Sequence, residues 1–364
     1  MIASIRAFVN RVLGRGEATI TVPSFDGALK PNQALGSADA LLECEAPEDV
    51  AVDGNSLLIA DGPRLLRLAG SSAMTVRTFE RPISALAARP GGGLAVALGG
   101  TEVRIYDDVS VENPGRVFRG ELHSVNALAP APDGSLIATD GSMVLGVDDW
   151  ARDLMELGQT GRVFRLDPKT GAVTRLAGGF GYAFGAVASG DNVLVSESWR
   201  HRLVSISPNG TSKIVLAHLP VYPSRLAPAA GGGYWLTAFT ARTQLVEFVL
   251  REPAYRRRML AEIEPEYWVV PRLRSGNSFK EPLQGAHIKT MGVMKPWAPP
   301  RSYGLVIRLG ADGSPRYSLH SRADGANHGI VSAVEFGEHL IMVAKGPRRI
   351  LRLPLSKLNA EVSA

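Results

Sequence analysis

The sequence is poor in features that mark several large classes of protein. It contains a single cysteine, Cys44, so no disulfide can form within the chain, and this favours a cytoplasmic location. No run of about 18 uncharged apolar residues is present, so no membrane-spanning helix is expected. Residues 1–16 also lack the continuous apolar core and the small-residue cleavage site of a secretory signal.

Charge of one sign is equally scarce. The 40 basic residues exceed the 35 acidic ones by a formal charge of only +5, and the densest basic stretch is Arg256–Arg258. Nucleic-acid binding normally needs a basic stripe together with stacking aromatic residues or a recognisable binding fold. The sequence therefore predicts no nucleic-acid partner.

The N-terminus has a distinct pattern. Apolar residues recur at helical spacing in MIASIRAFVNRVLGRG, with Arg6, Arg11 and Arg15 between them. This pattern predicts a basic amphipathic helix within an N-terminal extension, residues 1–40. Such a helix either packs on the rest of the protein or makes a peripheral contact with a membrane surface through residues 1–16, and the sequence leaves both alternatives open.

One unit recurs along the rest of the chain: an apolar strand, a Gly-containing turn, a second apolar strand and an alternating third strand. In the fifth copy the third strand falls on QLVEFVL. Units of roughly this length joined by glycine-rich hairpins are typical of propeller blades. We therefore predict an all-β, six-bladed β-propeller over residues 41–357; a β-sandwich would not require six similar units. The copies begin at Glu48, Ile83, Val125, Gly185, Ser224 and Val331.

Two insertions interrupt the repeats, at residues 141–160 and 250–303. Each contains a helical pattern, DDWARDLMEL in the first and EPAYRRRMLAEI in the second, and the second continues into a Pro-rich stretch with Trp268 and Trp297. Long insertions in a compact domain are usually lids or binding loops. We expect these two to cap one mouth of the propeller.

The central part of the chain resembles the strictosidine synthase-like proteins. The likeness rests on TGR, DP, the pair Glu197 and Arg202, the LPxYP stretch ending at Pro223, and Trp235. It extends from about residue 45 to about 355. These proteins belong to the propeller superfamily of paraoxonases, gluconolactonases and regucalcin, so the resemblance supports six blades but does not establish a reaction.

Several members of that superfamily bind calcium in the central channel, through residues just before the inner strand of each blade. By resemblance Glu48 and Asn126 match two of the calcium ligands. The next ligand position falls on Gly185, and a further pair falls on Ser224 and Arg225. Calcium requires six to eight oxygen ligands, and a guanidinium would repel it. We therefore expect no catalytic calcium, no metal site and no cofactor.

The alkaloid-forming branch of the family uses a glutamate just before the last inner strand. Here the nearest alignment places Val331 at that position, with Glu335 four residues further along the strand. Valine cannot transfer a proton, so genuine strictosidine synthesis is not expected.

The same register gives the candidate ligand-binding residues of the channel. Arg225 would pair with Glu48 across the channel, or bind a carboxylate or phosphate if it is unpaired. His328, in the segment NHGIVSAV, is the candidate general base, with a backbone-bonded loop histidine as the alternative. The candidate substrate-binding residues are Glu48, Ser84, Asn126, Ser224, Arg225 and Ser332.

Two functions remain open at the level of sequence. The first is a propeller that binds a small organic molecule in its channel and, if it is an enzyme, hydrolyses a lactone or ester, as the resemblance implies. The second is a catalytically silent binding or scaffold propeller. The altered calcium positions and Val331 favour the second, and a retained calcium site would favour the first.

Overall fold

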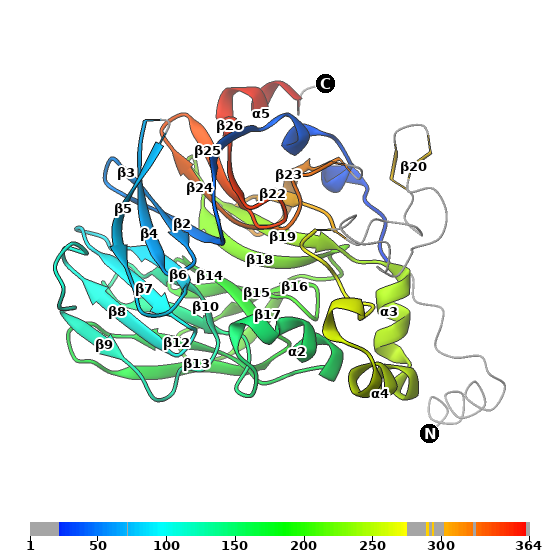
Figure 1. The fold of residues 1–364 in the computed structure, drawn as a ribbon, viewed down its shortest axis with the longest axis horizontal. Helices are drawn as coiled ribbons and strands as arrows, with labels where there is room; N and C mark the ends of the chain where they lie inside the picture. The colour runs from blue at the N-terminus through cyan, green and yellow to red at the C-terminus, as the bar shows by residue number, and fades with distance from the viewer. Residues whose placement is uncertain are drawn as a thin grey trace.

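The structure, a computed structural model, describes residues 22–70, 72–274, 289–290, 293–294, 302–322 and 325–361. Six four-stranded antiparallel sheets surround a central channel, which confirms the predicted propeller (Figure 1). The innermost strands of neighbouring sheets contact one another around the whole ring, from β2 through β6, β10, β14, β18 and β24 back to β2.

Each blade is ordered from its inner to its outer strand. Blades one and two consist of β2 Pro47–Asp53, β3 Ser56–Asp61, β4 Arg64–Ala69 and β5 Ser72–Thr78, then β6 Ile83–Ala88, β7 Leu94–Leu98, β8 Glu102–Tyr106 and β9 Arg116–Phe118. Blades three and four consist of β10 Val125–Pro130, β11 Leu136–Asp140, β12 Gly161–Leu166 and β13 Val173–Phe180, then β14 Ala183–Ser189, β15 Asn192–Glu197, β16 Arg202–Ile206 and β17 Ser212–Leu216. Blades five and six consist of β18 Val221–Pro228, β19 Tyr234–Ala241, β22 Leu305–Leu309 and β23 Pro315–His320, then β24 Ile330–Phe336, β25 His339–Ala344, β26 Arg349–Pro354 and β1 Asp39–Glu43.

The strand β1 closes the ring. It comes first in the chain but pairs with β26, so the outer strand of the last blade is supplied by the N-terminal side of the molecule (Figure 1). The preceding segment contains η1 Gly27–Leu29 and η2 Ala34–Ser37, and Leu35 within it is fully buried. The core lies in the seams between blades: Trp235 of blade five donates its Nε1–H to Glu335 of blade six at 2.6 Å. Trp235 therefore packs between blades.

Blade five corrects one expectation. Residues 244–250, expected to form its third strand, lie in helix α3, and the third strand is β22, which follows the insertion. The Thr243 hydroxyl accepts a hydrogen bond from the Val246 backbone N–H at 3.1 Å, which caps the helix. Val246 and Val249 are both buried and lie about one helical turn apart, so the apolar residues of this segment fit a helix as well as a strand. The second insertion thus begins directly after β19.

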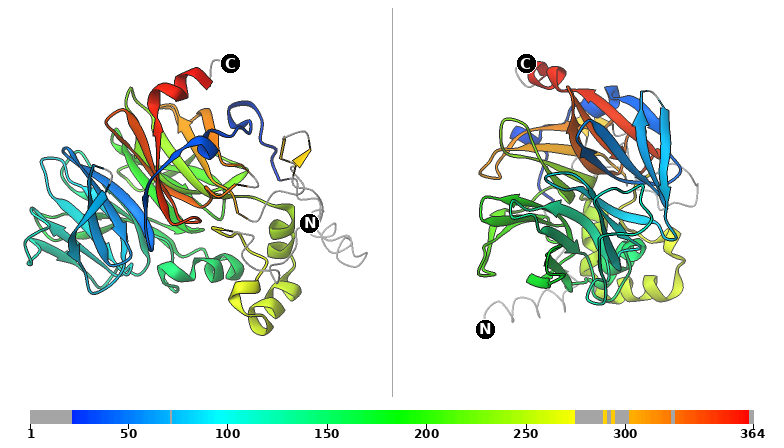
Figure 2. Two further views of the ribbon diagram at one scale, coloured as in Figure 1. Left: turned by 45° about the horizontal axis from the view of Figure 1, so that its top comes forward. Right: turned by 90° about the vertical axis from the view of Figure 1, so that its left-hand side faces the viewer.

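Both insertions contain the expected helices. The first forms η3 Val147–Asp149 and α2 Trp150–Glu156. The second begins after β19 rather than at residue 250, and it forms α3 Gln244–Arg251, α4 Pro253–Glu262 and η4 Pro265–Tyr267. Short β20 Lys289–Thr290 and β21 Val293–Met294 pair with each other, and α5 Leu355–Glu361 ends the described chain. Helices α2, α3 and α4 lie together on one side of the propeller in both figures (Figures 1 and 2).

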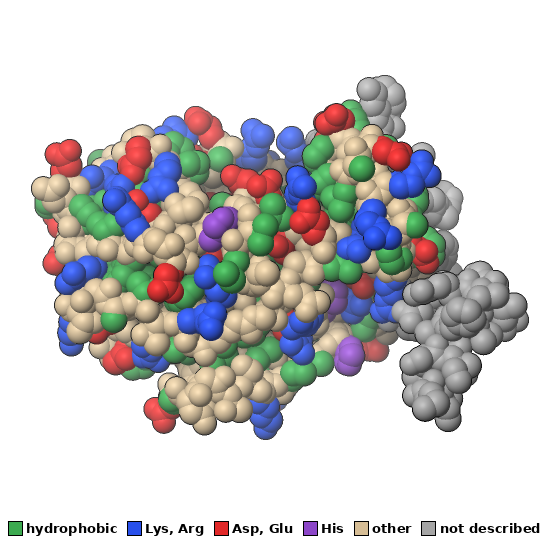
Figure 3. Space-filling model, turned by 90° about the horizontal axis from the view of Figure 1, so that it is seen from below, with side chains coloured by type: hydrophobic (Ala, Val, Ile, Leu, Met, Phe, Trp, Pro, Cys, Tyr) green, Lys and Arg blue, Asp and Glu red, His purple; other side chains and the backbone are tan. Residues whose placement is uncertain are grey.

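The remaining features concern the surface and the N-terminus. Among the described residues, none of the helices combines the length and apolar character needed to cross a bilayer. On the face seen in Figure 3, basic and acidic side chains are interspersed, in keeping with the small net charge. The amphipathic helix expected at residues 1–16, and Trp297, lie outside the described residues.

Candidate functional site

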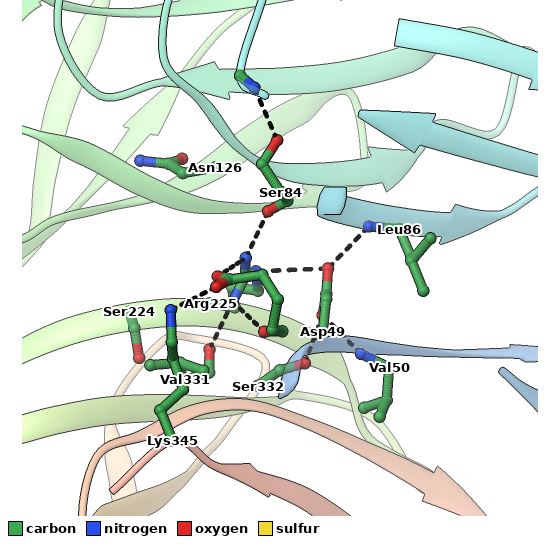
Figure 4. Close-up of polar contacts among 12 residues, drawn as sticks. Asp49, Val50, Ser84, Leu86, Asn126, Ser224, Arg225, Val331, Ser332 and Lys345 are labelled. Carbon is green, nitrogen blue, oxygen red and sulfur yellow. Dashed lines mark hydrogen bonds and ion pairs between the residues drawn. The ribbon is translucent and has the colours of Figure 1, made fainter. Parts of the chain in front are cut away.

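The guanidinium of Arg225 lies in the central channel and joins four blades. It extends from β18 of blade five, donating from Nη2 to Glu48 Oε1 at 2.9 Å and to the Ser84 carbonyl at 2.8 Å. From Nη1 it donates to the Glu48 carbonyl at 3.0 Å and to the Val331 carbonyl at 3.4 Å (Figure 4). The Arg225 side chain is only 6% exposed. The geometry realises the salt bridge with Glu48, one of the two alternatives left by the sequence.

Glu48 receives a second cation from the last blade. Lys345, the residue after β25, contacts the other carboxylate oxygen of Glu48, Oε2. Burial opposes ionisation of this carboxyl group, but Lys345 and Arg225 outweigh burial and lower the pKa of Glu48 below its usual value. Glu48 is therefore an ionised carboxylate held between two cations.

Asp49 contributes the second carboxylate of the cluster from the other side of β2. Its oxygens accept hydrogen bonds from the backbone N–H of Val50 and Leu86, each at 2.9 Å, and from the Ser332 hydroxyl at 2.7 Å. Arg225 Nε lies 3.4 Å from Asp49 Oδ2. Burial nevertheless dominates and raises the pKa of Asp49, which makes it the more easily protonated of the two neighbouring acids.

This cluster divides the channel into two chambers. The lid-side chamber has a volume of about 240 Å³ and is bordered by Glu48, Ser84 and Lys345. The opposite chamber has a volume of about 520 Å³ and is bordered by Asp49, Arg225 and Ser332, with mainly Ala, Val, Leu and Pro elsewhere. Because Arg225 and its partners lie between them, a ligand in the lid-side chamber rests on the Glu48 and Lys345 side chains.

Five aromatic side chains line the lid-side chamber. Tyr182 and Trp199 stack with ring centroids 4.6 Å apart, and Trp150 meets Phe239 edge to face at 5.4 Å. Phe184 lies below, with the Arg225 guanidinium carbon 5.3 Å from its ring centroid. Rings from blades four and five, from the connection between blades three and four, and from the lid helix α2 thus enclose a small apolar space with charged groups at its base.

Both insertions cover this chamber. The first contributes Gly146–Trp150 to its lining and the second contributes Leu273. The insertions also pack on each other through an apolar cluster that includes Met155 of α2, Met259 of α4 and Trp268. Arg256 of α4 donates to the Met155 carbonyl at 2.5 Å. The two insertions therefore form one lid, which agrees with the expected cap.

The structure separates the other candidate residues. Asn126 borders the lid-side chamber, but its amide donates to the Ala183 carbonyl at 2.9 Å and accepts from Thr139 at 2.7 Å. The Ser224 hydroxyl is fully buried against Thr237 at 2.8 Å and borders neither chamber. The lid-side chamber is therefore bordered by Glu48, Ser84 and Asn126. Arg225 and Ser332 border the opposite chamber, and Ser224 borders neither.

His328 lies away from the chamber, in the loop before β24. Its Nδ1 is 2.6 Å from the Ser302 hydroxyl and its Nε2 is 2.9 Å from the Arg322 carbonyl, and the side chain is buried. This matches the alternative of a backbone-bonded loop histidine, and the ring lies outside the lining of the lid-side chamber. Glu335 also lies away from the chamber, at the seam between blades five and six. Its carboxylate accepts hydrogen bonds from the Trp235 indole and from the Ala230 backbone N–H.

The residues that match calcium ligands by resemblance do not suit a calcium ion. The Glu48 carboxylate, the Glu48 carbonyl and the Ser84 carbonyl all accept from Arg225, so the cation that these oxygens bind is a guanidinium. Gly185 has no room for a ligating side chain, because a Cβ there would lie 2.5 Å from the Ser224 carbonyl oxygen. Over the described residues, no group of three or more His, Cys, Asp and Glu side chains has the arrangement of a metal site.

Sequence reasoning missed Lys345 and the aromatic wall residues Trp199 and Phe239. Lys345 and Trp199 follow the second strands of their blades, β25 and β15, where the chain turns toward the channel mouth. Both lie within two residues of the end of a second strand, and that placement is the signal that could have identified them. Glu197 and Arg202, which carry part of the family likeness, form an ion pair, and Glu197 also accepts from Arg200 at 2.8 Å.

Comparison with curated proteins finds similarity over most of the chain. The adipocyte plasma membrane-associated protein of Homo sapiens is 26% identical over 306 residues, covering 72% of this chain and 73% of that protein. The Mus musculus protein of the same name is 25% identical over 310 residues, with the same coverage. No family model matches the sequence.

Solved propellers share the fold at lower identity. A gluconolactonase from Xanthomonas campestris is 14% identical with a TM-score of 0.55, covering 92% of this chain and 96% of its own. A regucalcin from Agrobacterium tumefaciens is 12% identical with a TM-score of 0.51, covering 89% and 93%. The chain is thus a six-bladed β-propeller of the architecture seen in gluconolactonase and regucalcin, and it is similar in sequence to the adipocyte plasma membrane-associated proteins.

Proposed function

We propose that the protein binds a small organic molecule with a planar apolar body in its lid-side chamber, without calcium, and that it belongs to the strictosidine synthase-like branch of the propellers. The observation that carries the proposal is the lidded chamber of about 240 Å³, walled by aromatic rings and based on Glu48 and Lys345. Ligand sites are typically apolar cavities with a few convergent polar groups, and this chamber has that composition.

The aromatic wall sets the character of the ligand body. Tyr182 and Trp199 are held as a stacked pair, and Trp150 and Phe239 are held edge to face, so their rings present flat apolar surfaces to the chamber. Aromatic pairs gain about 0.5–1.5 kcal/mol beyond the area they bury. A ligand with a flat apolar ring fits such walls better than a flexible sugar does.

The base of the chamber sets the character of the ligand's polar end. Lys345 carries three N–H donors, of which Glu48 takes one, and its side chain is 29% exposed. Glu48 is already shared between two cations. A carbonyl or carboxylate oxygen on the ligand would therefore find its best partner in Lys345.

A second function, hydrolysis of a lactone or ester, is favoured by the same lysine. A fixed ammonium beside a carbonyl stabilises the negative charge that develops on its oxygen. The similar fold of a protein described as a gluconolactonase is consistent with this chemistry. Against it stands the lowered pKa of Glu48, which makes that carboxylate a weak base. Strictosidine synthesis is not part of the proposal, because the apolar Val331 borders the chamber at the position of the family's glutamate.

A panel of neutral and anionic planar aromatic compounds, lactones and aryl esters tests both functions. Thermal shift reports binding and product formation reports turnover, each in EDTA. Phe184→Ala and Lys345→Met should lower affinity at least tenfold, whereas Phe248→Ala should not, because Phe248 is an exposed ring on α3 outside the chamber. Binding without turnover would support the silent binding alternative. Equal effects of Phe184→Ala and Phe248→Ala would contradict a ligand in this chamber.

We also propose a location and partners for the protein. It is cytoplasmic, it binds a small-molecule ligand, and it makes a peripheral membrane contact through residues 1–16. Sedimentation of the full chain with anionic vesicles, compared with Arg6→Glu/Arg11→Glu, tests the membrane contact.

A further inference from the structure

The lid and the aromatic wall of the chamber are joined by a hydrogen bond between a half-buried indole and a buried carboxylate. Trp199 donates from its indole Nε1 to Asp153 Oδ1 at 2.7 Å. Asp153 belongs to lid helix α2 and is 3% exposed, whereas Trp199 belongs to the turn after β15 of blade four. The bond therefore crosses from the lid to the propeller.

The surroundings of Asp153 leave room for its carboxylate. A Cβ at Gly158 would lie 2.3 Å from both Asp153 carboxylate oxygens, so the space they occupy depends on a glycine at that position. The Gly158 backbone N–H also donates to the Asp153 carbonyl at 2.8 Å, which ends the helix beside the carboxylate. The backbone thus holds Asp153 from the lid side of the bond.

Trp199 is held just as firmly on the propeller side. Its backbone N–H donates to the Gly181 carbonyl at 2.9 Å, and the Ser198 N–H donates to the Tyr182 carbonyl at 3.0 Å. Its indole ring stacks on Tyr182, and both rings border the chamber. Any movement of α2 that breaks the bond to Asp153 frees the indole N–H and one wall of the chamber together.

We propose that Asp153 is a positioning residue that couples the lid to the wall: its carboxylate fixes the Trp199 ring, so that the lid position and the shape of the ligand chamber change together. One consequence, that ligand binding closes the lid, rests on the proposed function. The coupling itself exists without ligand and can be measured without one. A ligand that stacks on Trp199 would favour the closed lid by linkage.

Amide hydrogen exchange of the full chain without ligand tests the coupling. Asp153→Ala removes the acceptor, Trp199→Phe removes the donor but keeps a ring, and Asp153→Asn keeps an acceptor oxygen. A side-chain hydrogen bond to a carboxylate or an amide oxygen supports up to about a tenfold change in a local opening equilibrium. We expect Asp153→Ala and Trp199→Phe each to speed exchange about tenfold in α2 and at Ser198 and Trp199, the double variant to add little, and Asp153→Asn to lie near the parent protein.

The pattern of changes decides the proposal. Faster exchange in α2 alone, with the turn after β15 unchanged, would mean a purely local role for Asp153 in its helix and would overturn the coupling. Additive effects in the double variant would overturn it as well. If Asp153→Ala does not fold, Trp199→Phe carries the test, since it leaves the lid sequence intact. Failure of the ligand panel leaves these outcomes unaffected, so the two proposals fail separately.

Discussion

At the scale of single residues, Arg225 determines the chemistry of the channel. Its N–H groups reach the oxygens of Glu48, Ser84 and Val331, and it brings a permanent positive charge between two buried carboxylates. An arginine suits this position because its planar guanidinium directs several donors at once and stays protonated. One side chain thus links blade five to blades one, two and six.

Removing this charge should be costly. Arg225→Met would leave Glu48 and Asp49 buried near each other without their shared partner, and breaking a buried pair in this way typically costs about 3–5 kcal/mol. Chemical unfolding measures the loss. Arg258→Met is the matched control, because Arg258 pairs with Glu262 at the surface and should unfold close to the parent protein. Equal stabilities of the two variants would contradict the central role of Arg225.

The same cluster gives a pH dependence with a definite sign. The pKa of Glu48 is lowered in the folded protein, so its ionised form stabilises the fold above the usual pKa of 4.5, and this contribution is lost as the pH falls through the folded value. The difference in unfolding free energy between the parent protein and Glu48→Gln should be largest near neutral pH and should shrink below about pH 4.5. Asp49, whose pKa is raised, acts in the opposite direction but is present in both proteins. A difference that stays constant from pH 7 to pH 3 would refute this assignment.

Calcium should not stabilise the protein through the channel. The oxygens that the resemblance places at a calcium site already accept from Arg225. A ligand present at about 100 times its Kd adds about 2.7 kcal/mol to folding stability, which a thermal-shift titration detects easily. We expect the same unfolding temperature in EDTA and in millimolar calcium, with magnesium as the control ion. A calcium-specific rise at micromolar concentration would show that other oxygens complete a site.

At the scale of elements, the close approach of the inner strands limits the size of the side chains that they can carry. A Cβ at Gly185 of β14 would lie 2.5 Å from the Ser224 carbonyl oxygen and 2.6 Å from Arg225 Cα, both in the backbone of β18. Gly185→Ala should therefore cost about 1–3 kcal/mol by overpacking and should disturb the Arg225 contacts. Gly178→Ala, on the outer strand β13, has its nearest neighbour at 3.7 Å and should be nearly neutral. Unfolding curves of the two variants check this, and similar midpoints would contradict it.

Elements whose signal is local were predictable from sequence, and those whose signal depends on the fold were not. Each inner strand carries its own apolar pattern beside a turn, so the sequence predicted all six. The run at residues 244–251 is amphipathic at both strand and helix spacing. It forms a helix because Thr243 caps it and because its apolar side packs in the lid. The register before each inner strand placed Glu48, Ser84 and Asn126 on the chamber. Lys345 and Trp199 were missed because the direction of a side chain in a turn depends on turn geometry that the periodicity does not encode.

At the scale of the whole molecule, stability depends on closing the ring. Six inner strands contact each other in a circle, but blade six is completed only when β1 returns to β26, and the segment before β1 buries Leu35 against the same blade. Without β1, the edge of β26 would present unpaired N–H and C=O groups, which favour pairing with other chains. The strongest constraint on the molecule thus joins residues at opposite ends of the described chain.

A truncation series tests this closure. A chain beginning at Glu45 lacks β1 and Leu35, and we expect it to unfold at a markedly lower temperature and to self-associate through β26, because a fully buried leucine alone is worth about 2–5 kcal/mol. A chain beginning at Val22 retains both and is the matched comparison. A peptide of residues 22–45 added in trans should restore the unfolding temperature and the monomer of the shorter chain, as judged by thermal unfolding and size-exclusion chromatography. If the chain beginning at Glu45 were as stable and as monomeric as the chain beginning at Val22, then five blades and an open sixth would suffice, and β1 would be an accessory strand.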